Sequence, residues 1–455
     1  MAPPERPPLP PGPYLVVGLA RSGVAAAEAL HARGERVYGT DSGSPPGGGR
    51  LAELGVEVEL DGDGTDLLDR VQTLIKSPGV PAEAPVVATA RERGMPVIGE
   101  LELGWSLLPN RFVALTGTNG KTTVAEWLGH VWEEAGEPGV VAGNVGTPLA
   151  SLAGSLDPEA TVICECSSFQ LEDSVEFAPE VALLLNVTPD HLDRHGDFDS
   201  YLDAKLRIFA NQPAGATALI DADDPVLAEV EVDGDATLER FGTVSCSSPE
   251  AACAVWLEDE VVRDAAGPLL GRDELALAGE HNLRNAMAVA AAALAAGVDR
   301  DAVVAGLRTF AGVPHRLERV AEIGGVAYVN DSKATNVAAA AAALTAFDGG
   351  VHAILGGSLK GGGFADLIPM VAARCSACYL IGEAESRLAA DLAPAGVPLE
   401  RCGDLASAVR AAAAAAGPGE TVLLAPACAS FDAFRDYEQR GERFAELVAG
   451  LERAS

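Results

Sequence analysis

Short apolar runs alternate with longer amphipathic stretches over the first hundred residues, and Gly-rich turns separate them. The predicted strands are Tyr14–Val17, Arg36–Gly39 (ending at Asp41) and Thr73–Ile75, and the predicted helices run up to Arg33 and over Ala84–Gly94. Strands that alternate with helices predict a doubly wound parallel sheet. The stretch from Asp41 to Gly49 is rich in Gly, Ser and Pro, so we predict a surface loop there.

The same alternation recurs twice further along the chain. The apolar strands expected there are Phe112–Leu115, Thr161–Cys164, Val181–Asn186, Thr217–Ile220, Val326–Asn330, Val351–Leu355, Cys378–Ile381 and Thr421–Ala425. Ala-rich segments between them, such as Glu280–Gly297, favour helix because alanine is the best helix former. The chain therefore predicts an α/β protein with three successive α/β domains, at residues 1–100, 101–312 and 313–455.

Charge and composition exclude several classes of protein. The chain has 32 Lys+Arg against 66 Asp+Glu, a net charge of −34, which opposes binding to nucleic acid and to anionic membranes. With 48% hydrophobic residues it has the material for packed cores. No apolar run reaches the ~18 residues of a membrane helix. The Pro-rich start lacks the pattern of a signal peptide, so we predict a soluble, cytoplasmic protein without membrane insertion.

The eight cysteines do not form a recognisable metal or disulfide framework. The pairs Cys164/Cys166 and Cys375/Cys378 have no second CxxC or His pair at zinc-site spacing. We therefore predict free thiols that are mostly buried.

Lysine is rare in this chain. Only five lysines occur, at positions 76, 121, 205, 333 and 360, which leaves 27 arginines among the basic residues. A GC-rich genome explains the scarcity but not the positions, because four of the five lie in Gly-, Thr- or Asn-rich motifs. Such lysines are candidates for roles that need a compact charge or an amine that can lose its proton.

The segment Gly117–Thr123 joins a predicted strand to a predicted helix. Its glycines let backbone amides turn toward a phosphate, Lys121 neutralises charge and Thr122 can ligate Mg²⁺. Leu115 stands where the full Walker spacing needs Gly, so this is a compressed phosphate loop. The flanking strand and helix favour phosphate binding over an ordinary turn.

The first turn, Gly18–Gly23, has the outline of a dinucleotide-binding fingerprint. Asp41 lies some twenty residues further on, where a ribose contact is expected. However, Ala20 replaces the middle glycine, which weakens the close approach to a pyrophosphate. A purely structural βα turn is an equally good interpretation.

Several ionisable residues follow the strands of the central domain. Glu165 ends a buried strand, where a carboxylate is costly unless it is paired or binds a metal. His191 lies just past the next strand, and Asp193 and His195 are interpreted as solvated loop residues. Taken alone, Lys205 in the predicted helix Tyr201–Phe209 favours a lysine that pairs with Asp203 or with a phosphate.

Three polar motifs follow apolar strands of the third domain: Asn330–Asn336, Gly356–Gly363 and Ala425–Phe431. Their position puts them at one edge of the predicted sheet, which is typical of a ligand surface. His315 and Arg316, at the border of this domain, could fold back over a nucleotide.

Taken together these motifs resemble a known family. The sequences are GTNGKTT, ECSSFQLE, NVTPDHLDRH, YLDAKLRIF, GEHNLRNA, PHRLE, NDSKATN and PACASFDAFRDYEQRG, in this order. The chain resembles the Mur ligases of peptidoglycan synthesis, and within them the branch that adds D-glutamate. A DNPR-type loop, expected in the meso-diaminopimelate-adding branch, is absent from the sequence.

The resemblance implies Rossmann-like N- and C-terminal domains around a central P-loop ATPase domain. It implies a monomeric ATP-dependent ligase that phosphorylates the carboxylate of UDP-N-acetylmuramoyl-L-alanine. The amine of D-glutamate then attacks the acyl phosphate to form an amide.

The resemblance also implies the site residues. Lys121 would hold the ATP phosphates, Thr122 and Glu165 one Mg²⁺, and His191 and Lys205 a second Mg²⁺, with Lys205 carbamylated by CO₂. Further nucleotide contacts would come from Gly117, Thr118, Asn119, Gly120, Thr123, Asn144, Asn285, Arg316 and Asp331. Substrate contacts would come from Asp41, Ser42 and Ser77 for the UDP part, and from Lys333, Thr335, Lys360, Ser430 and Phe431 for D-glutamate. Lys76 matches none of these roles.

Two alternatives stay open at this point. Another amide ligase of the superfamily, such as a folylpolyglutamate synthase, would lack the N-terminal UDP domain that the first hundred residues predict. A nucleotide-binding regulator without catalysis would be indicated by the loss of Glu165, His191 or Lys205, and all three are present.

Overall fold

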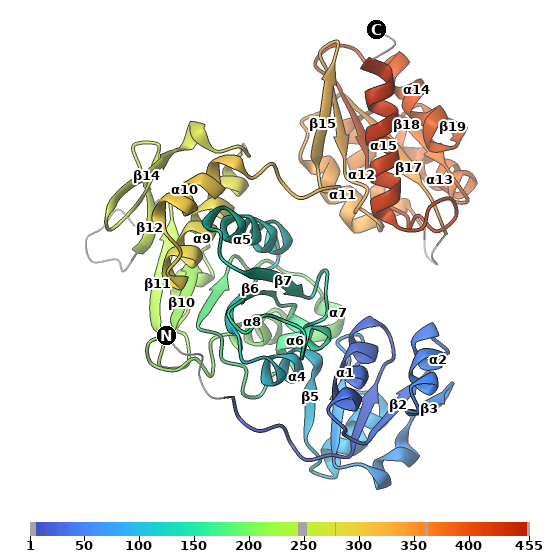
Figure 1. Cartoon of the computed structure of the whole chain (residues 1–455). Helices are drawn as coiled ribbons and strands as arrows, with labels where there is room; N and C mark the ends of the chain where they lie inside the picture. Colours follow the sequence, from blue (N-terminus) through green and yellow to red (C-terminus); the bar gives the residue numbers. More distant parts are fainter. Residues whose placement is uncertain (1–5, 244–252, 278, 360–362, 453–455) are drawn as a thin grey trace. The chain divides into compact units, whose positions relative to one another are not determined.

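The computed structural model describes residues 6–243, 253–277, 279–359 and 363–452 (Figure 1). The chain divides into two compact units, Met1–Ala311 and Gly312–Ser455. Within the described residues the first unit holds a five-stranded and a nine-stranded sheet, and the second holds a six-stranded sheet.

The N-terminal sheet is entirely parallel, in the order β3-β2-β1-β4-β5. Its strands are β1 (Tyr14–Val17), β2 (Val37–Asp41), β3 (Glu57–Leu60), β4 (Thr73–Lys76) and β5 (Val97–Gly99). Val16 and Ile75 pack on one face with α1 (Arg21–Ala32), whereas Leu15 and Leu74 pack on the other with α3 (Pro85–Glu92). Apolar residues on both faces are what a doubly wound parallel sheet requires.

The predicted loop from Asp41 to Gly49 is wrong over its second half, because helix α2 (Pro46–Glu53) begins there. Pro46 occupies the first turn of the helix, where its missing amide hydrogen is not needed. A Cβ on Gly47 would lie 2.4 Å from the Leu19 carbonyl oxygen, and one on Gly48 would lie 2.8 Å from Leu60 Cδ2. The glycines therefore allow close packing of a helix.

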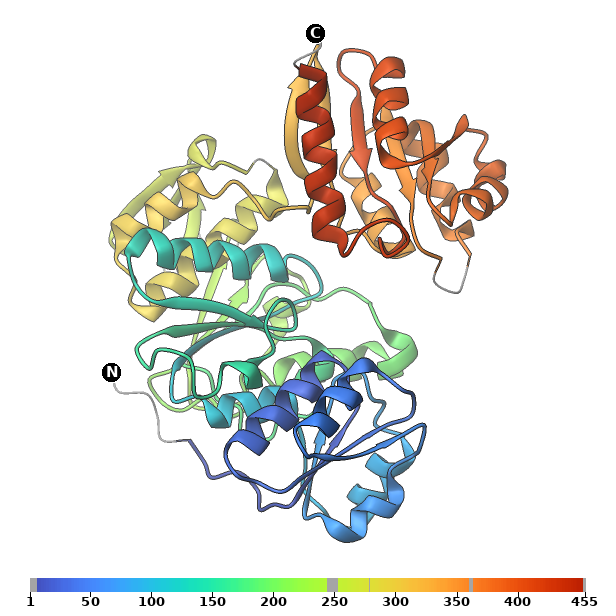
Figure 2. The same cartoon turned by 45° about the vertical axis from the view of Figure 1, so that its right-hand side comes forward.

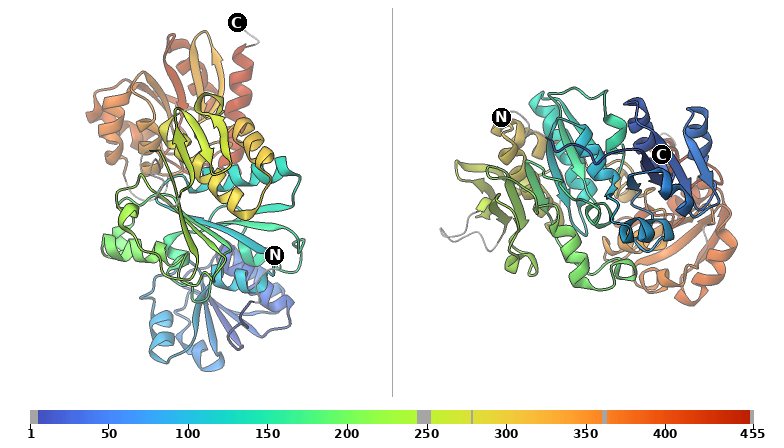
Figure 3. Two further views of the ribbon diagram at one scale, coloured as in Figure 1. Left: turned by 90° about the vertical axis from the view of Figure 1, so that its left-hand side faces the viewer. Right: turned by 90° about the horizontal axis from the view of Figure 1, so that it is seen from below.

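The central sheet has the order β14-β13-β12-β11-β10-β9-β6-β8-β7. Its strands are β6 (Arg111–Thr116), β7 (Gly139–Gly143), β8 (Thr161–Glu165), β9 (Val181–Leu184), β10 (Thr217–Asp221), β11 (Thr237–Gly242), β12 (Cys253–Glu258), β13 (Val261–Asp264) and β14 (Gly267–Gly271). The last three form an antiparallel extension, drawn in yellow-green in Figure 3, which the sequence analysis did not predict. The remaining pairs are parallel.

Helices cover both faces of this sheet. Helices α5 (Lys121–Ala135), α9 (Glu280–Ala296) and α10 (Arg300–Thr309) lie against one another on one face (Figure 2). The other face packs against α8 (Phe198–Leu206) and α4 (Glu100–Leu107). Leu103 of α4 belongs to the N-terminal core, whereas Leu101 and Trp105 belong to the central core. One helix thus joins two cores, which explains why residues 1–311 form one unit.

The six-stranded sheet of the second unit has the order β15-β16-β20-β17-β18-β19 and is parallel except at β15. Its strands are β15 (Glu318–Ile323), β16 (Val326–Asn330), β17 (Val351–Gly356), β18 (Cys375–Ile381), β19 (Leu399–Gly403) and β20 (Thr421–Leu424). Its helices are α11 (Val337–Thr345), α12 (Ile368–Arg374), α13 (Glu385–Leu392), α14 (Leu405–Ala415) and α15 (Tyr437–Glu452). Helix α15 runs beside β15 (Figure 2).

The cysteines follow the prediction only in part. Cys164, Cys166, Cys375, Cys378 and Cys402 are free, as expected. Cys253 is disulfide-bonded, so the prediction of free thiols is wrong for this residue. Among the described helices, none is both long enough and apolar enough to span a bilayer.

Candidate active site

The phosphate loop connects α5 to β6, the strand that lies between β9 and β8 in the central sheet. Gly120 has φ of +81°, a conformation that favours glycine. A Cβ at this position would also lie 2.6 Å from Asn285 Oδ1, on α9. The loop and Asn285 are therefore brought together, and the space between them accepts no side chain at Gly120.

Two lysines share one acceptor in this loop. Lys121 Nζ and Lys205 Nζ each donate to the Gly117 carbonyl oxygen at 2.8 Å, and Lys121 also donates to the Thr118 carbonyl oxygen at 2.8 Å. Burial, and then the nearby charge of Lys121, lowers the pKa of Lys205 to about 7. The interpretation of Lys205 as a partner of Asp203 is wrong, because tertiary folding directs its side chain to Gly117, 88 residues away in sequence.

Glu165 ends β8 beside the phosphate loop and is 1% exposed. Its Oε1 accepts a hydrogen bond from Asn144 Nδ2 at 2.8 Å, whereas its Oε2 has no hydrogen-bond partner within the described part of the chain. Thr122, on the first turn of α5, is also buried. A buried, unsatisfied carboxylate oxygen and a hydroxyl are donors that Mg²⁺ prefers, so these residues fit the metal that the resemblance implies.

His191 lies at the start of the short helix α7 (Leu192–His195) with φ of +53°. Its ring is exposed, with Nε2 3.5 Å from Asp190 Oδ2 and the ring centroid 5.0 Å from that of Phe169. No group of three or more His, Cys, Asp or Glu side chains that could hold a metal ion exists among the residues described. The structure thus does not gather His191 into a metal cluster.

The interpretation of His195 as a solvated loop residue is wrong. A ring nitrogen of His195 lies 3.0 Å from Ser168 Oγ, and the ring stacks on Phe169 at 5.3 Å between centroids. Packing against an aromatic ring removes much of its surface from water.

A cavity of about 560 Å³ opens at the carboxyl ends of β1, β2 and β4. Asp41, Ser42 and Ser77 line it, and so do Asn144 and Gln170 from the central domain. Asp41 Oδ2 accepts from the Leu19 amide at 2.7 Å, and Ser77 Oγ donates to the Gly18 carbonyl oxygen at 2.6 Å. Asn144 therefore links the wall of the cavity to Glu165, the carboxylate beside the phosphate loop.

In the second unit, polar residues gather where β16 and β20 end. Asp331 accepts a hydrogen bond from the Leu317 amide at 3.0 Å. Burial raises the pKa of Asp331 to about 6, although the charges of Arg316 and Lys333 lower it in part. Ser430 is buried, and its Oγ has no hydrogen-bond partner among the described residues.

The other predicted residues of this unit differ in exposure. Thr335 is half-buried, Phe431 is 70% exposed, and Arg316 is exposed. The Lys333 ammonium lies 5.9 Å from the ring centroid of Tyr437. Lys360 lies outside the described residues.

Comparisons with known proteins show which family models and relatives this chain matches. Three family models match: the Mur ligase MurD-like N-terminal domain over residues 13–99, the Mur ligase middle domain over 115–293, and the Mur ligase glutamate ligase domain over 315–428. The UDP-N-acetylmuramoylalanine--D-glutamate ligase of Acidobacterium capsulatum is 42% identical over 95% of each chain. The one from Rubrobacter xylanophilus is 44% identical over 96% of this chain and 98% of the relative.

The chain belongs to the Mur ligase family. The predicted family and the α/β fold class are thereby confirmed, while the domain limits at residues 100 and 312 stay predictions. A solved structure, the UDP-N-acetylmuramate-alanine ligase MurC of Thermotoga maritima, covers 96% of this chain and 99% of its own at a TM-score of 0.56. At 18% identity that likeness concerns the fold alone.

One residue of this Mur ligase was missed by the sequence analysis. Arg440, on α15, is buried, and burial lowers its pKa to about 10. Its guanidinium donates to the carbonyl oxygens of Ser332 at 2.9 Å, Cys428 at 3.1 Å and Ala429 at 3.2 Å. It therefore ties together the loops after β16 and β20, which carry the predicted D-glutamate contacts. The motif PACASFDAFRDYEQRG contains Arg440, but its partners are set by tertiary folding.

Proposed function

We propose that this chain is an ATP-dependent, ADP-forming ligase that joins D-glutamate to UDP-N-acetylmuramoyl-L-alanine in peptidoglycan precursor synthesis. The observation that carries the proposal is the position of Asn144, which lines the cavity and donates to Glu165. A carboxylate at the inner end of a cavity-bound substrate would meet the phosphate loop there. The names and the 42% and 44% identities of the relatives support the same reaction.

The first step is transfer of the ATP γ-phosphoryl group to the substrate carboxylate. A carboxylate oxygen forms a bond to phosphorus, the bond to the ADP oxygen breaks, and an acyl phosphate results. Backbone amides of Gly117–Thr123 and the Lys121 ammonium would stabilise the charge of this transfer. Thr122 and Glu165 would hold one Mg²⁺, which when bound neutralises phosphate charge.

Lys205 has a separate role in the proposal. Its neutral amine would attack CO₂ and release a proton to solvent, which converts the side chain into a carbamate anion. Burial and the pKa of about 7 support this reaction, because only the neutral amine is a nucleophile. Together with His191, the carbamate would supply oxygen and nitrogen ligands to a second Mg²⁺.

In the second step the D-glutamate amine attacks the acyl carbon, inorganic phosphate leaves and the amine loses a proton. The side chains proposed to bind D-glutamate are Lys333, Thr335, Lys360, Ser430 and Phe431, and those proposed to bind the nucleotide include Asn144, Asn285, Arg316 and Asp331. The unsatisfied Ser430 hydroxyl supports a polar ligand at this place. A cytoplasmic location and a monomeric state stay predictions.

Phosphate release tests the proposal. Purified protein with ATP, Mg²⁺ and UDP-N-acetylmuramoyl-L-alanine is given a panel of D- and L-amino acids. We expect release to require D-glutamate and to be stoichiometric with the amide product. Release that is equal for all amino acids, or that occurs without the UDP substrate, contradicts the assignment.

A further inference from the structure

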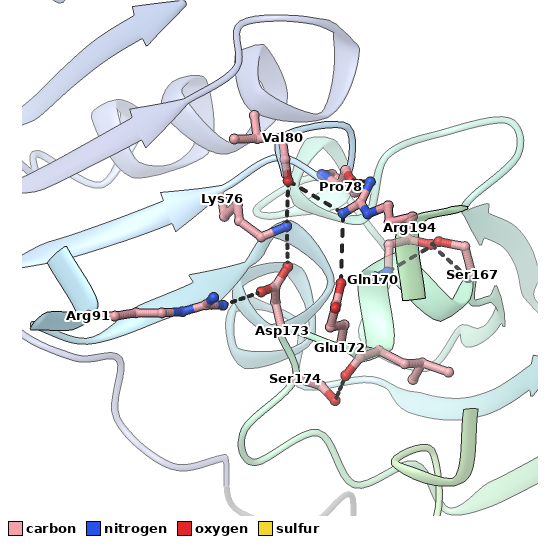
Figure 4. A network of polar contacts seen from close by, with 11 residues as sticks. Lys76, Pro78, Val80, Arg91, Ser167, Gln170, Glu172, Asp173, Ser174 and Arg194 are labelled. Atoms are coloured by element: carbon pink, nitrogen blue, oxygen red, sulfur yellow. Dashed lines mark hydrogen bonds and ion pairs between the residues drawn. The ribbon is translucent and has the colours of Figure 1, made fainter. Parts of the chain in front are cut away.

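The loop that follows β4 is held by two cations from different parts of the chain. Ser77, Pro78, Gly79 and Val80 all line the cavity. The carbonyl oxygen of Val80 accepts from Lys76 Nζ at 2.9 Å and from Arg194 at 3.4 Å, and that of Pro78 accepts from Arg194 at 2.9 Å (Figure 4). We refer to residues 77–80 as the cavity loop.

Lys76 also makes an ion pair in the protein interior. Its side chain is 0% exposed, and Nζ lies 2.6 Å from Oδ2 of Asp173, which is itself buried. The other oxygen of Asp173 lies 3.2 Å from an Arg91 nitrogen (Figure 4). Because a buried charge is costly when its partner is removed, this pair fixes the start of the cavity loop against the central domain.

Arg194, like Lys76, contacts both a carboxylate and the Val80 carbonyl oxygen. It lies 3.7 Å from Oε2 of Glu172, the neighbour of Asp173 in sequence. Adjacent carboxylates thus hold two cations, and both cations donate to the same Val80 carbonyl oxygen. The duplication ties the cavity loop to the segment that contains Glu172 and Asp173.

This segment also reaches the phosphate side of the site. The guanidinium of Arg194 lies 4.0 Å from the ring centroid of Phe169, and that ring is 5.0 Å from the ring of His191. Gln170, next to Phe169, lines the cavity. A molecule in the cavity would therefore touch both the cavity loop and the short helix α6 (Ser168–Leu171) that packs against His191.

We propose that Lys76 and Arg194 are positioning residues that couple the cavity to the segment carrying His191. A ligand that orders the cavity loop would also fix Arg194, Phe169 and His191, and nucleotide binding would order the cavity loop in return. The coupling must be equal in both directions, because it is a free energy shared by two binding events. The inference rests on the proposed function for the identity of the two ligands.

Calorimetric titration of the full chain tests the coupling. The dissociation constant of UDP-N-acetylmuramoyl-L-alanine is measured with and without a non-hydrolysable ATP analogue and Mg²⁺. For the unaltered protein we expect the analogue to tighten binding by a factor of about 5–150. In Arg194→Gln the factor should fall to about 1, while each ligand alone still binds within about threefold.

The test of Lys76 avoids leaving a single buried charge. Lys76→Met with Asp173→Asn removes the ion pair as a neutral pair, and circular dichroism checks that the double variant folds. We expect the same loss of coupling, since Val80 loses its buried donor. Arg93→Gln is the matched control, because Arg93 pairs at the surface with Asp69 at 2.7 Å and should keep the full coupling.

The possible outcomes separate the two hypotheses. If the unaltered protein shows no coupling, or if Arg194→Gln and the folded double variant keep it, the positioning role is wrong. If the unaltered protein neither binds the UDP substrate nor releases phosphate with D-glutamate, the proposed function itself is wrong.

Discussion

Two fully buried lysines, Lys76 and Lys205, occupy contrasting environments in the first unit. Lys76 is 2.6 Å from the Asp173 carboxylate, which a second cation, Arg91, also contacts. Lys205 donates to a neutral carbonyl oxygen and faces the charge of Lys121. The two side chains are equally inaccessible, so burial alone does not distinguish them.

The difference shows how one residue type acquires two functions. A carboxylate partner compensates the desolvation of an ammonium, so Lys76 serves as the cationic half of an ion pair that holds the Val80 carbonyl. Without such a partner, burial favours the neutral amine, and the pKa of Lys205 falls to about 7. A neutral amine is a nucleophile toward CO₂. Arginine could replace neither lysine in these roles. Its planar guanidinium differs in shape from the Lys76 ammonium, and it stays charged where Lys205 must become neutral.

We expect the largest loss of activity when the Lys205 amine, the more reactive of the two, is removed. Lys205→Ala and Lys205→Arg should each lower kcat by about 1000-fold, because a charged ligand next to the transferred phosphoryl group is lost. Acetate in the buffer should restore part of the activity of Lys205→Ala, since a small carboxylate can occupy the place of the carbamate. Steady-state phosphate release at several acetate concentrations measures this.

The arginine variant serves as the internal control for charge. Acetate should not rescue Lys205→Arg, because the guanidinium fills the space. Substantial activity in Lys205→Arg would mean that a positive charge suffices, and the carbamate hypothesis would then be wrong.

A smaller effect is expected at Arg440, a third buried cation, which binds carbonyl oxygens of two loops. Arg440→Lys keeps the charge but cannot reproduce the fork of donors. We expect the KM for D-glutamate to rise by about 10–100-fold, the range seen when a group that orients ligands is removed. The KM for the UDP substrate should not change.

The matched control for Arg440 lies on the same helix. Arg443 pairs at the surface with Glu446 at 2.7 Å, so Arg443→Lys should behave as the unaltered protein. Equal rises in the KM for D-glutamate and for the UDP substrate in Arg440→Lys would indicate general damage to the fold.

The contrast also indicates which features a sequence reveals. The strands Tyr14–Val17 and Val326–Asn330 were predicted with their observed bounds, because an apolar run between turn residues is a local signal. The first part of helix α2, up to Gly49, was predicted as a loop, because its glycines are needed for packing against Leu19 and Leu60, which local sequence does not show. The strands β12–β14 lie at the sheet edge and have mixed exposure, so their pattern is weak.

The partners of buried charges were beyond sequence reasoning for a related reason. Lys76 contacts Asp173, and Lys205 contacts Gly117, and each partner is distant in the sequence. The low number of lysines indicated that both residues are unusual. Only the fold shows that Lys76 has a carboxylate partner and Lys205 a carbonyl partner. For Glu165, in contrast, the sequence already predicted the need for a partner, because a carboxylate at the end of an apolar strand is costly to bury, and Asn144 donates a hydrogen bond to it.

Direct detection of the carbamate sharpens the comparison further. After equilibration with ¹³C-labelled CO₂ at pH 8, we expect a carbamate carbon signal in the ¹³C NMR spectrum that depends on Lys205, apart from the signals of accessible amines. The signal should disappear in Lys205→Arg and persist in the double variant Lys76→Met with Asp173→Asn, because the Lys205 amine has no carboxylate partner to keep it charged. A signal that is unchanged in Lys205→Arg, or that is lost only in the Lys76 and Asp173 double variant, would contradict the assignment of the reactive amine.

The smallest expected effect is the pH dependence of stability that Lys205 contributes. Its pKa is about 7 when folded, and in the unfolded chain it returns to the ordinary 10.5. Between these values the unfolded state binds more protons than the folded state, so the free energy of unfolding rises with pH. The destabilisation is complete below about pH 7 and disappears above about pH 10.5.

Urea unfolding of unaltered protein and Lys205→Met, in buffer free of CO₂ and Mg²⁺, isolates this contribution, because other titrating groups cancel in the difference. We expect the unaltered protein to gain stability relative to Lys205→Met as the pH rises from 7 to 10. A difference that is constant over this range would mean that Lys205 stays charged in the folded protein, and the contrast with Lys76 would be lost.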